Sequence, residues 1–333
     1  MTQTVPAPTR AEFRACAERL LDFLAAQFDA EGRHRTHPEA PAFHYKLVYV
    51  FNYGGRRGLA LRVLDHLEQT LIAADGSFRD PQLNGADSQY LYQAGWLAWG
   101  CAALGRFDLA RRLARRAAAA QDPAFGGFWN ATDLGRVQWL LNSSSAAAGC
   151  AAAGELAPAR AAARYMARLY ERQPDPANRF YFSLDAQGEV IAQGGAEPTR
   201  NFFDLHGWAR PAMLATAIAG LVWTGRQTGE AAHYDLAQRY AAVILSHRHH
   251  PERMQFASKS GWAVLQLAPH RPDPALRAYA EGVGRRALEL QAPDGSVDVR
   301  GWPGLAQGAP PAITLNNGCD WALTALALGH GGA

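Results

Sequence analysis

The chain has 333 residues, of which 48% are apolar and 19% are charged, so it can bury a large core and is not expected to be disordered as a whole. Its net charge of +3 is small and no basic block stands out, which argues against a nucleic-acid partner. No run of about 18 apolar residues is present, and the first residues lack the features of a secretory signal. We therefore expect a cytoplasmic protein without a membrane span.

Cysteine and lysine usage adds two expectations. The 4 cysteines are scattered without C-x-x-C spacing and are expected to be reduced thiols rather than a disulfide framework. Only two of the 33 basic residues are lysines, Lys46 and Lys259. In a chain that uses arginine as its default cation, both lysines are candidate functional residues.

Apolar periodicity predicts a helical chain. Residues 1–9 are expected to be extended or disordered, and residues 10–330 are expected to form a single domain. The helices are predicted over residues 10–29, 43–53, 57–73, 88–104, 107–121, 137–153, 156–172, 210–224, 230–247, 258–268, 273–291 and 316–329.

Two kinds of glycine turn separate these helices and repeat about every fifty residues, which is typical of stacked supersecondary units. The first kind lies within a helix pair, where glycine suits the left-handed position after a helix, and comprises Gly54-Gly55, Gly105, Gly154 and Gly225 to Gly229. The second kind places Asp-Gly or Gly-Gly beside an aromatic or apolar residue between one pair and the next. It occurs at 75–78, 125–128 and 294–297, with a drifted copy near 178–180.

The two helices of each pair differ in charge. Second helices, such as 107–121 and 156–172, carry charges on one face, as expected of helices with a solvated side. First helices, such as 88–104 and 137–153, are almost free of charge, as expected of helices buried on all sides. This alternation predicts an all-α (α/α)6 toroid, a barrel of six helical hairpins with inner and outer rings. An open solenoid is the alternative, although polar capping repeats are missing at both ends.

An (α/α)6 toroid gathers the N-termini of its inner helices at one mouth, where free N–H groups can hold anions or ligand oxygens. Polar and aromatic residues near these helix starts are therefore candidate substrate-binding groups. They are His44, Tyr45, Lys46, Tyr90, Trp139, Asn142, Asn201, Trp208, Lys259, Trp262, Asn316 and Asn317. The lysines can hold a carboxylate or phosphate or act as a base, and the alternative is a salt bridge across the mouth. The tryptophans can stack on a ring, although core packing is their default role.

Four residues are candidate acid–base groups. His206 can act as a general base oriented by Asp204; alternatively, Asp204 caps the following helix and His206 is a structural group. Asp87 precedes an inner helix, where it is either a second acid–base group or an N-cap. Asp320, expected one turn into the last inner helix, is costly to bury without a partner and is a candidate acid.

Motifs for cofactors are absent from the sequence. It contains no P-loop, no G-x-G-x-x-G after a strand, no H-E-x-x-H and no G-x-S-x-G, so no metal or nucleotide cofactor is expected. The run from His247 to His250 is predicted to end an outer helix, where cations suit the helix dipole, rather than to bind metal. Cys150 and Cys319 have no neighbouring His and are interpreted as buried thiols rather than nucleophiles.

Three parts of the chain resemble known repeat families. Residues 92–106 and 122–129 resemble a repeat of the N-acylglucosamine 2-epimerase group. Residues 207–225 and 234–237 are similar to six-hairpin glycosidases, including unsaturated glucuronyl hydrolases. Residues 259–262 and 291–296 look like terpene-cyclase-type toroids, to which linalool dehydratase-isomerase is similar. These likenesses lie in the repeat scaffold and imply the (α/α)6 fold more than an activity.

The departures from these families limit what the resemblance implies. The C-terminal His motif of the epimerases, the DxDD motif of protonating terpene cyclases and the zinc ligands of lanthionine cyclases are not matched. We expect a metal-independent acid–base enzyme that acts on a small molecule at the barrel mouth, as a monomer or homodimer. A sugar isomerase or epimerase, or a glycoside hydrolase, is the leading expectation. The alternatives are a dehydratase, isomerase or cyclase of a terpenoid or other secondary metabolite, and a non-catalytic toroid that binds a ligand or peptide.

Overall fold

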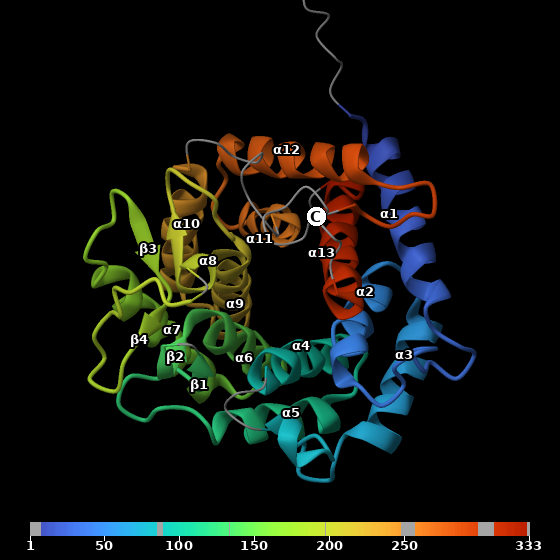
Figure 1. Cartoon of the computed structure of the whole chain (residues 1–333), viewed down its shortest axis with the longest axis horizontal. Coiled ribbons are helices and arrows are strands. Elements are labelled where there is room, and N and C mark those ends of the chain that lie inside the picture. The colour runs from blue at the N-terminus through green and yellow to red at the C-terminus, as the bar shows by residue number, and fades with distance from the viewer. Residues whose placement is uncertain are drawn as a thin grey trace, which may run out of the picture.

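The computed structural model describes residues 8–84, 89–132, 134–196, 198–247, 257–298 and 310–331. Over these ranges the chain is mainly helical, and its helices form two concentric rings (Figure 1). No helix of the described residues is long and apolar enough to cross a membrane.

The inner ring consists of helices that are almost free of charge. Every residue of the inner helix Ser258–Leu267 is buried, for example, because the helix is surrounded by neighbours on all sides. Each inner helix packs against the next along the chain, and the last packs against the first. The ring is formed by α2 (Leu47–Tyr53), α4 (Tyr90–Ala103), α6 (Leu140–Ala152), α9 (Ala212–Thr228), α11 (Ser258–Leu267) and α13 (Pro311–Gly329).

The outer helices bury one face against the inner ring and expose the other. In the outer helix Phe107–Ala118, leucines and alanines are buried while arginines face solvent. The outer ring is formed by α1 (Arg10–Ala26), α3 (Arg57–His66, continued by a π-turn over Leu67–Leu71), α5 (Phe107–Ala118), α7 (Leu156–Glu171), α10 (Ala231–Leu245) and α12 (Pro274–Leu290).

The two ends of the described chain close the rings. Helix α1 packs along α13, so the first outer helix completes a pair with the last inner helix, and α13 also contacts α2 (Figure 1). A solenoid would leave these surfaces apart, so the open alternative is wrong and the predicted (α/α)6 toroid is confirmed.

Close approach of the inner helices depends on small residues. A Cβ on Gly95 of α4 would lie 2.3 Å from the carbonyl oxygen of Ser145 on α6, and one on Gly149 would lie 2.6 Å from the carbonyl oxygen of Gly95. Glycine at both positions therefore lets the backbones of α4 and α6 touch.

The turns of the second kind, which carry Asp-Gly or Gly-Gly after an outer helix, pack against neighbouring outer helices. A Cβ on Gly76 would lie 2.6 Å from the backbone of Arg112 in α5, and one on Gly126 would lie 2.2 Å from the backbone of Ala161 in α7. Gly295 meets the backbone of Arg19 in α1 in the same way. The repeat detected in the sequence is thus a contact that links one outer helix to the next around the ring.

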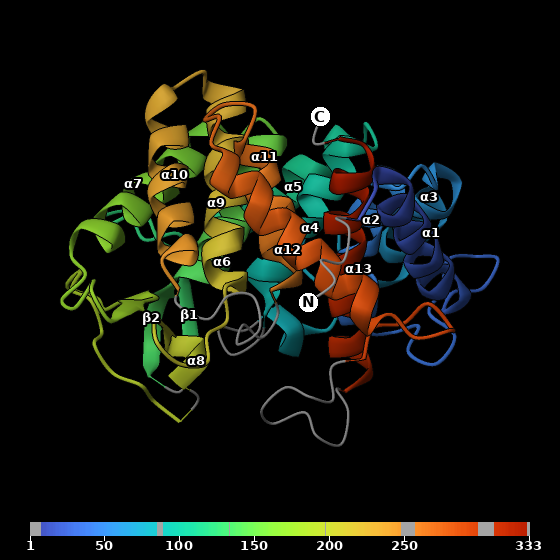
Figure 2. The same cartoon turned by 90° about the horizontal axis from the view of Figure 1, so that it is seen from above.

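Short strands lie at one end of the rings, beside α8 (Pro198–Asn201) (Figure 2). One sheet has the order β1-β2-β4, with antiparallel pairs such as Trp129 opposite Gln138 and Gln138 opposite Leu184. A second sheet pairs β3 with β5. The strands are β1 (Trp129–Thr132), β2 (Gly135–Trp139), β3 (Arg179–Tyr181), β4 (Ser183–Leu184) and β5 (Phe202–Asp204).

One local prediction is wrong in this region. Residues 137–139 were expected to begin a helix but belong to β2, because they pair with β1 on one side and partly with β4 on the other. The turn expected near 178–180 ends at Asn178, directly before β3, and a further turn runs from Asp185 to Gly188. There Asp185 Oδ1 accepts from the N–H groups of Gln187 and Glu189, and Gly188 has a φ of 74°.

Candidate active site

Both lysines of the chain are buried inside the inner ring and share one aspartate. Lys46 and Lys259 are each 2% exposed. Lys46 Nζ lies 2.8 Å from Asp320 Oδ1, and Lys259 Nζ lies 3.7 Å from Asp320 Oδ2. The salt bridge that was the structural alternative for the lysines is therefore present, and it lies on the axis of the barrel.

Three inner helices bring these charges together. Lys46 is the N-cap residue of α2, and Lys259 lies in the first turn of α11. Asp320 was expected one turn into the last inner helix, but α13 begins at Pro311, so Asp320 lies about two and a half turns from its start. Helix α13 thus begins five residues before the predicted start at residue 316, and Asp320 lies further from the N-terminus of the helix than expected.

Tyr92 in the first turn of α4 completes the group. Lys259 Nζ donates a hydrogen bond to the Tyr92 hydroxyl oxygen at 2.6 Å, and Lys46 Nζ lies 5.6 Å from the centroid of the Tyr92 ring. We call Lys46, Tyr92, Lys259 and Asp320 the axial cluster. Tyr92 was not among the residues predicted from the sequence, although its spacing from Trp96 and Trp99 marks one face of α4 with aromatic residues.

Tyr45 and Asn316 border the axial cluster. The Tyr45 hydroxyl donates to Asn316 Oδ1 at 2.9 Å, and the rings of Tyr45 and Tyr92 meet edge to face at 5.7 Å. A cavity of about 10 Å³, the volume of one water probe, is lined by Tyr45, Lys46, Asn316 and Cys319 among others. Five residues chosen from sequence, namely Tyr45, Lys46, Lys259, Asn316 and Asp320, therefore come together.

The axial cluster carries unbalanced charge when its tyrosine is neutral. Two ammonium groups and one carboxylate leave a net charge of +1 in a buried site, which is costly. Burial opposes ionisation of Tyr92, but the charges of Lys259 and then Lys46 outweigh burial and lower the pKa of the phenol below its usual value. A Tyr92 phenolate would make the cluster neutral.

The pKa values of the neighbouring groups Tyr45, Cys319 and Lys46 are raised rather than lowered. Burial raises the pKa of Tyr45 and of the Cys319 thiol well above their usual values, so both stay protonated. For Lys46, burial disfavours the charge, but the neighbouring groups, Asp320 first and then Tyr92, together outweigh burial and raise the pKa. Tyr92 is thus the group of this site that is shifted toward giving up its proton.

An aromatic layer lies next to the axial cluster. Lys46 Nζ is 5.0 Å and Lys259 Nζ is 5.6 Å from the centroid of Trp96, within the range of cation–π attraction. Trp96 stacks on Trp99 at 5.1 Å, and Trp262 lies 5.4 Å from Trp99. Trp262, predicted as a ligand-stacking residue, is completely buried in this layer.

Asp204 and His206 lie outside the axial cluster. Asp204 Oδ1 accepts from the backbone N–H groups of His206 and Gly207, at 2.9 and 3.0 Å, and the exposed His206 ring contacts Asn178 Oδ1 at 3.1 Å. The carboxylate thus organises its own loop and does not orient the imidazole, nor does it cap α9, whose N-cap residue is Pro211. Their catalytic assignment stays a prediction without geometric support.

The other candidates have separate partners. The Tyr90 hydroxyl donates to Gly76 O, Trp139 Nε1 to Arg200 O, Asn142 Nδ2 to Asn130 Oδ1 and Asn201 Nδ2 to Gly194 O. His44 accepts from the N–H of His34, Asn317 Oδ1 accepts from Ser258, and Trp208 is half-buried. Asp87 lies outside the described residues, as does most of the run from His247 to His250.

Among the described residues, no group of three or more His, Cys, Asp or Glu side chains is placed to hold a metal ion. The 4 cysteines are buried and unpaired.

Comparison with known proteins supports the fold. No family model matches the chain, and no curated protein matches it. A GH76 α-mannanase from Bacteroides thetaiotaomicron aligns with a TM-score of 0.67 and 11% identity, covering 95% of both chains. A D-mannose isomerase aligns with a TM-score of 0.66 and 9% identity, covering 96% of this chain and 99% of that one. An unsaturated glucuronyl hydrolase specific for heparin aligns with a TM-score of 0.62 and 15% identity, covering 96% of each chain.

The likeness to terpene-cyclase toroids also holds for the fold. A type II terpene cyclase from Scytonema aligns with a TM-score of 0.59 and 14% identity, covering 96% of this chain and 99% of that one. The chain shares the (α/α)6 toroid of these proteins. At such low identity their activities do not transfer with the fold.

Proposed function

We propose that the protein is an enzyme that moves a proton next to a carbonyl group, an isomerase or epimerase of a small sugar-like molecule. The observation that carries this proposal is the 2.6 Å contact between Lys259 Nζ and the Tyr92 hydroxyl, in a buried site with two ammonium groups and one carboxylate. This arrangement favours a phenolate, and a phenolate beside ammonium groups is a base next to proton and hydrogen-bond donors.

Each residue of the axial cluster has a separate role in the proposed reaction. Tyr92 as phenolate takes the proton from the carbon next to the carbonyl group, and the electron pair of that C–H bond moves to form an enediolate. Lys259 and Lys46 stabilise the negative charge on its oxygen by hydrogen bonding and proximity. For isomerisation, Tyr92, now a phenol, returns the proton to the neighbouring carbon, and the proton of the adjacent hydroxyl passes by way of Lys259 or Lys46 to the former carbonyl oxygen. For epimerisation, the enediolate turns over within the site before Tyr92 returns the proton to the opposite face of the same carbon. Asp320 holds Lys46 in place throughout.

Substrate entry requires a rearrangement at the border of the cluster. The cavity beside Lys46 holds about one water, so a sugar can reach the lysines only if Tyr45 and Asn316 move apart. Closure after entry would exclude water from the enediolate, which such a reaction needs.

A glycoside hydrolase fits the described residues less well. Most such enzymes use two carboxyl groups, about 5–5.5 Å apart in retaining and 6.5–9.5 Å apart in inverting enzymes. Among the described residues the buried acids are Asp122 and Asp320, and Asp122 Oδ1 is already bound to the N–H groups of Ala124 and Phe125. Only one carboxylate is therefore present in the axial cluster.

A terpenoid cyclase or dehydratase is the second candidate, because the aromatic layer of Trp96, Trp99 and Trp262 could stabilise a carbocation. Such a reaction begins with proton donation by an acid. Asp320, the one carboxyl group of the axial cluster, lies 2.8 Å from Lys46 Nζ and 3.7 Å from Lys259 Nζ, so it is engaged as an acceptor for the lysines rather than as a proton donor. The same contacts thus favour proton abstraction over protonation of an alkene.

The test is a product screen by ¹H NMR with mannose, glucose, fructose, N-acetylglucosamine, α-1,6-mannan and linalool. We expect interconversion of one sugar pair, a loss of more than 100-fold in Tyr92→Phe, and activity within about threefold of wild type in His206→Ala. Tyr170→Phe on α7 is the matched control, since it removes a phenol hydroxyl far from the axis while keeping the ring. Turnover of mannan or linalool alone, or of nothing, would contradict the proposal, as would full activity in Tyr92→Phe.

A further inference from the structure

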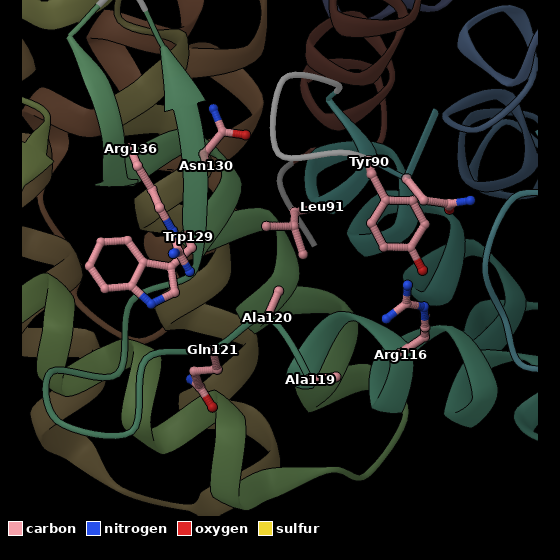
Figure 3. Close-up of a pocket in the computed structure, with 10 residues that line it drawn as sticks. Tyr90, Leu91, Arg116, Ala119, Ala120, Gln121, Trp129, Asn130 and Arg136 are labelled. Carbon is pink, nitrogen blue, oxygen red and sulfur yellow. The ribbon is translucent and has the colours of Figure 1, made fainter. Parts of the chain in front are cut away.

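A second cavity, of about 410 Å³, lies between the start of α4, the end of α5 and the β1–β2 hairpin (Figure 3). Its volume is in the range of small-molecule sites. It shares no lining residue with the axial cluster, and the proposed function makes no use of it. Its walls include Tyr90, Leu91, Arg116, Trp129 and Arg136.

The two sides of this cavity each present a guanidinium group. Figure 3 shows Arg136 beside Trp129 on one side and Arg116 beside Tyr90 on the other, with Leu91 between them. None of the described residues that line it is acidic. Arg116 has a carboxylate within reach, because its Nε lies 3.9 Å from Asp75 Oδ2, but that distance is too long for a hydrogen bond.

Among the residues that the structure describes, Arg136 stacks on an indole and has no anionic partner. Its guanidinium carbon lies 4.8 Å from the centroid of Trp129, and it has no ion pair with any described carboxylate. Stacking on an indole occupies the flat face of the guanidinium and leaves its N–H edge free for a carboxylate or phosphate. The side chain is therefore ordered and exposed, with unused donors at the cavity wall.

Two other polar side chains of the cavity wall, Asn130 and Tyr90, already have hydrogen-bond partners within the protein. Asn130 Oδ1 accepts from Asn142 Nδ2 at 2.7 Å, and Asn130 Nδ2 donates to Ala131 O at 2.8 Å. The Tyr90 hydroxyl donates to Gly76 O at 3.0 Å. The groups that remain available to a ligand are the guanidinium groups of Arg116 and Arg136 on opposite sides of the cavity and the apolar surfaces of Trp129 and Leu91.

We propose that this cavity binds an anionic saccharide that has an acidic group toward each end. One acidic group pairs with Arg136 and the other with Arg116, while a sugar ring lies against Trp129 and Leu91. Arginine recognises carboxylate and phosphate by the same paired N–H geometry, so the acid can be a uronate or a sugar phosphate. The site is separate from the axial cluster and does not depend on the function assigned to that cluster.

Isothermal titration calorimetry of the full chain tests the proposal with digalacturonate, glucose 1,6-bisphosphate and the neutral disaccharide cellobiose. We expect one of the two anionic probes to bind at least tenfold more tightly than cellobiose, and its binding to weaken when salt is raised from 0.05 to 0.5 M. The probe that binds identifies a uronate or a phosphate as the acid. Binding should weaken at least tenfold in Arg136→Gln and in Arg116→Gln.

Arg111→Gln is the matched control, because Arg111 lies on the solvent side of the same helix as Arg116. It should bind the probe as the wild type does, and so should Tyr92→Phe, whose change lies in the axial cluster. Arg136 is exposed, so its substitution leaves the fold intact, which circular dichroism verifies. Equal affinity for cellobiose, no binding of either anion, or unchanged affinity in both arginine variants would overturn the proposal.

Discussion

Asp320 carries one negative charge between two lysines, so the protonation of Tyr92 decides the charge of the whole buried cluster. An uncompensated charge at such depth costs several kcal/mol. The tyrosine that accepts a hydrogen bond from Lys259 is therefore part of a balanced group rather than a packing residue.

Tyr92 should ionise before Tyr45 and Tyr49. The lysines lower its pKa, whereas burial raises the pKa of Tyr45 and Tyr49. A titration followed by phenolate absorbance at 295 nm should show one early step in the wild type that is missing from Tyr92→Phe and present in Tyr170→Phe. If the early step persists in Tyr92→Phe, another residue provides it and the charge argument fails.

Asp320→Asn should be strongly destabilising, because it takes the carboxylate from Lys46 and leaves two buried ammonium groups with at most one negative charge, that of Tyr92. The expected loss is about 3–5 kcal/mol in the free energy of unfolding, measured by urea denaturation. Asp22→Asn removes an exposed partner of Arg56 and should cost at most about 1 kcal/mol. Similar losses in the two variants would show that the axial cluster does not hold its charges as described.

His44 should make the fold sensitive to acid. The ring is buried and accepts a hydrogen bond from the N–H of His34, and burial lowers its pKa to about 4. The folded protein therefore stays unprotonated there down to about pH 4, while the unfolded chain takes up a proton near pH 6.5. Stability is full above pH 6.5 and falls by about 3 kcal/mol as the pH drops to about 4.

Urea denaturation between pH 7 and pH 4.5 measures this effect. His44→Gln should flatten the decline, whereas His206→Gln, which changes an exposed ring, should keep the wild-type slope. An unchanged slope in His44→Gln would assign the acid sensitivity to other groups.

Some of these residues could be found from the sequence and others could not. The rarity of lysine pointed to Lys46 and Lys259, and the cost of burying a charge pointed to Asp320. Tyr92 was missed because one more aromatic residue in an apolar helix looks like core. Asp204 and His206 were chosen because they are neighbours in sequence, yet the loop directs the carboxylate to backbone N–H groups instead.

Among the secondary-structure elements, the glycines in turns within a helical hairpin and those in turns between hairpins are required for different reasons. Gly55 and Gly126 both have positive φ values, 76° and 84°. A Cβ on Gly55 meets nothing within 4 Å, whereas a Cβ on Gly126 would lie 2.2 Å from the carbonyl oxygen of Ala161. The turn inside a hairpin needs only the backbone conformation, and the turn between hairpins also needs the space.

Gly126→Ala should therefore cost more than Gly55→Ala. The left-handed conformation alone costs about 1–2 kcal/mol for alanine, which is the loss expected in Gly55→Ala. The clash with α7 in Gly126→Ala adds to this, so we expect a loss larger by at least about 1 kcal/mol in thermal or urea unfolding. Equal losses would mean that the contact between the turn and α7 is loose.

The helices were predictable because their apolar period and glycine ends are local signals. The short strands were not, since β2 depends on pairing with residues of β1 and β4 that follow different helices. The start of α13 was also missed, because Pro310 and Pro311 resemble a loop in sequence, whereas in the structure Pro311 is the first residue of the helix.

At the scale of the whole molecule, ring closure creates the axial cluster. Lys46, Tyr92, Lys259 and Asp320 come from α2, α4, α11 and α13, so they meet only when the last inner helix returns to the first. The sequence pattern predicted this closure and hence a common location for residues far apart in the chain. It could not predict which side chains point to the axis, because that depends on the rotation of each inner helix.

The central claim is that Tyr92 removes a proton next to a carbonyl group. Incubation of the responsive sugar in D₂O, followed by ¹H NMR, measures this step directly as replacement of that proton by deuterium. We expect exchange in the wild type and in Tyr170→Phe, and a loss of more than 100-fold in Tyr92→Phe, in a sample whose folding is verified by circular dichroism. Exchange at the wild-type rate in Tyr92→Phe, or sugar conversion without any deuterium uptake beside the carbonyl group, would contradict it.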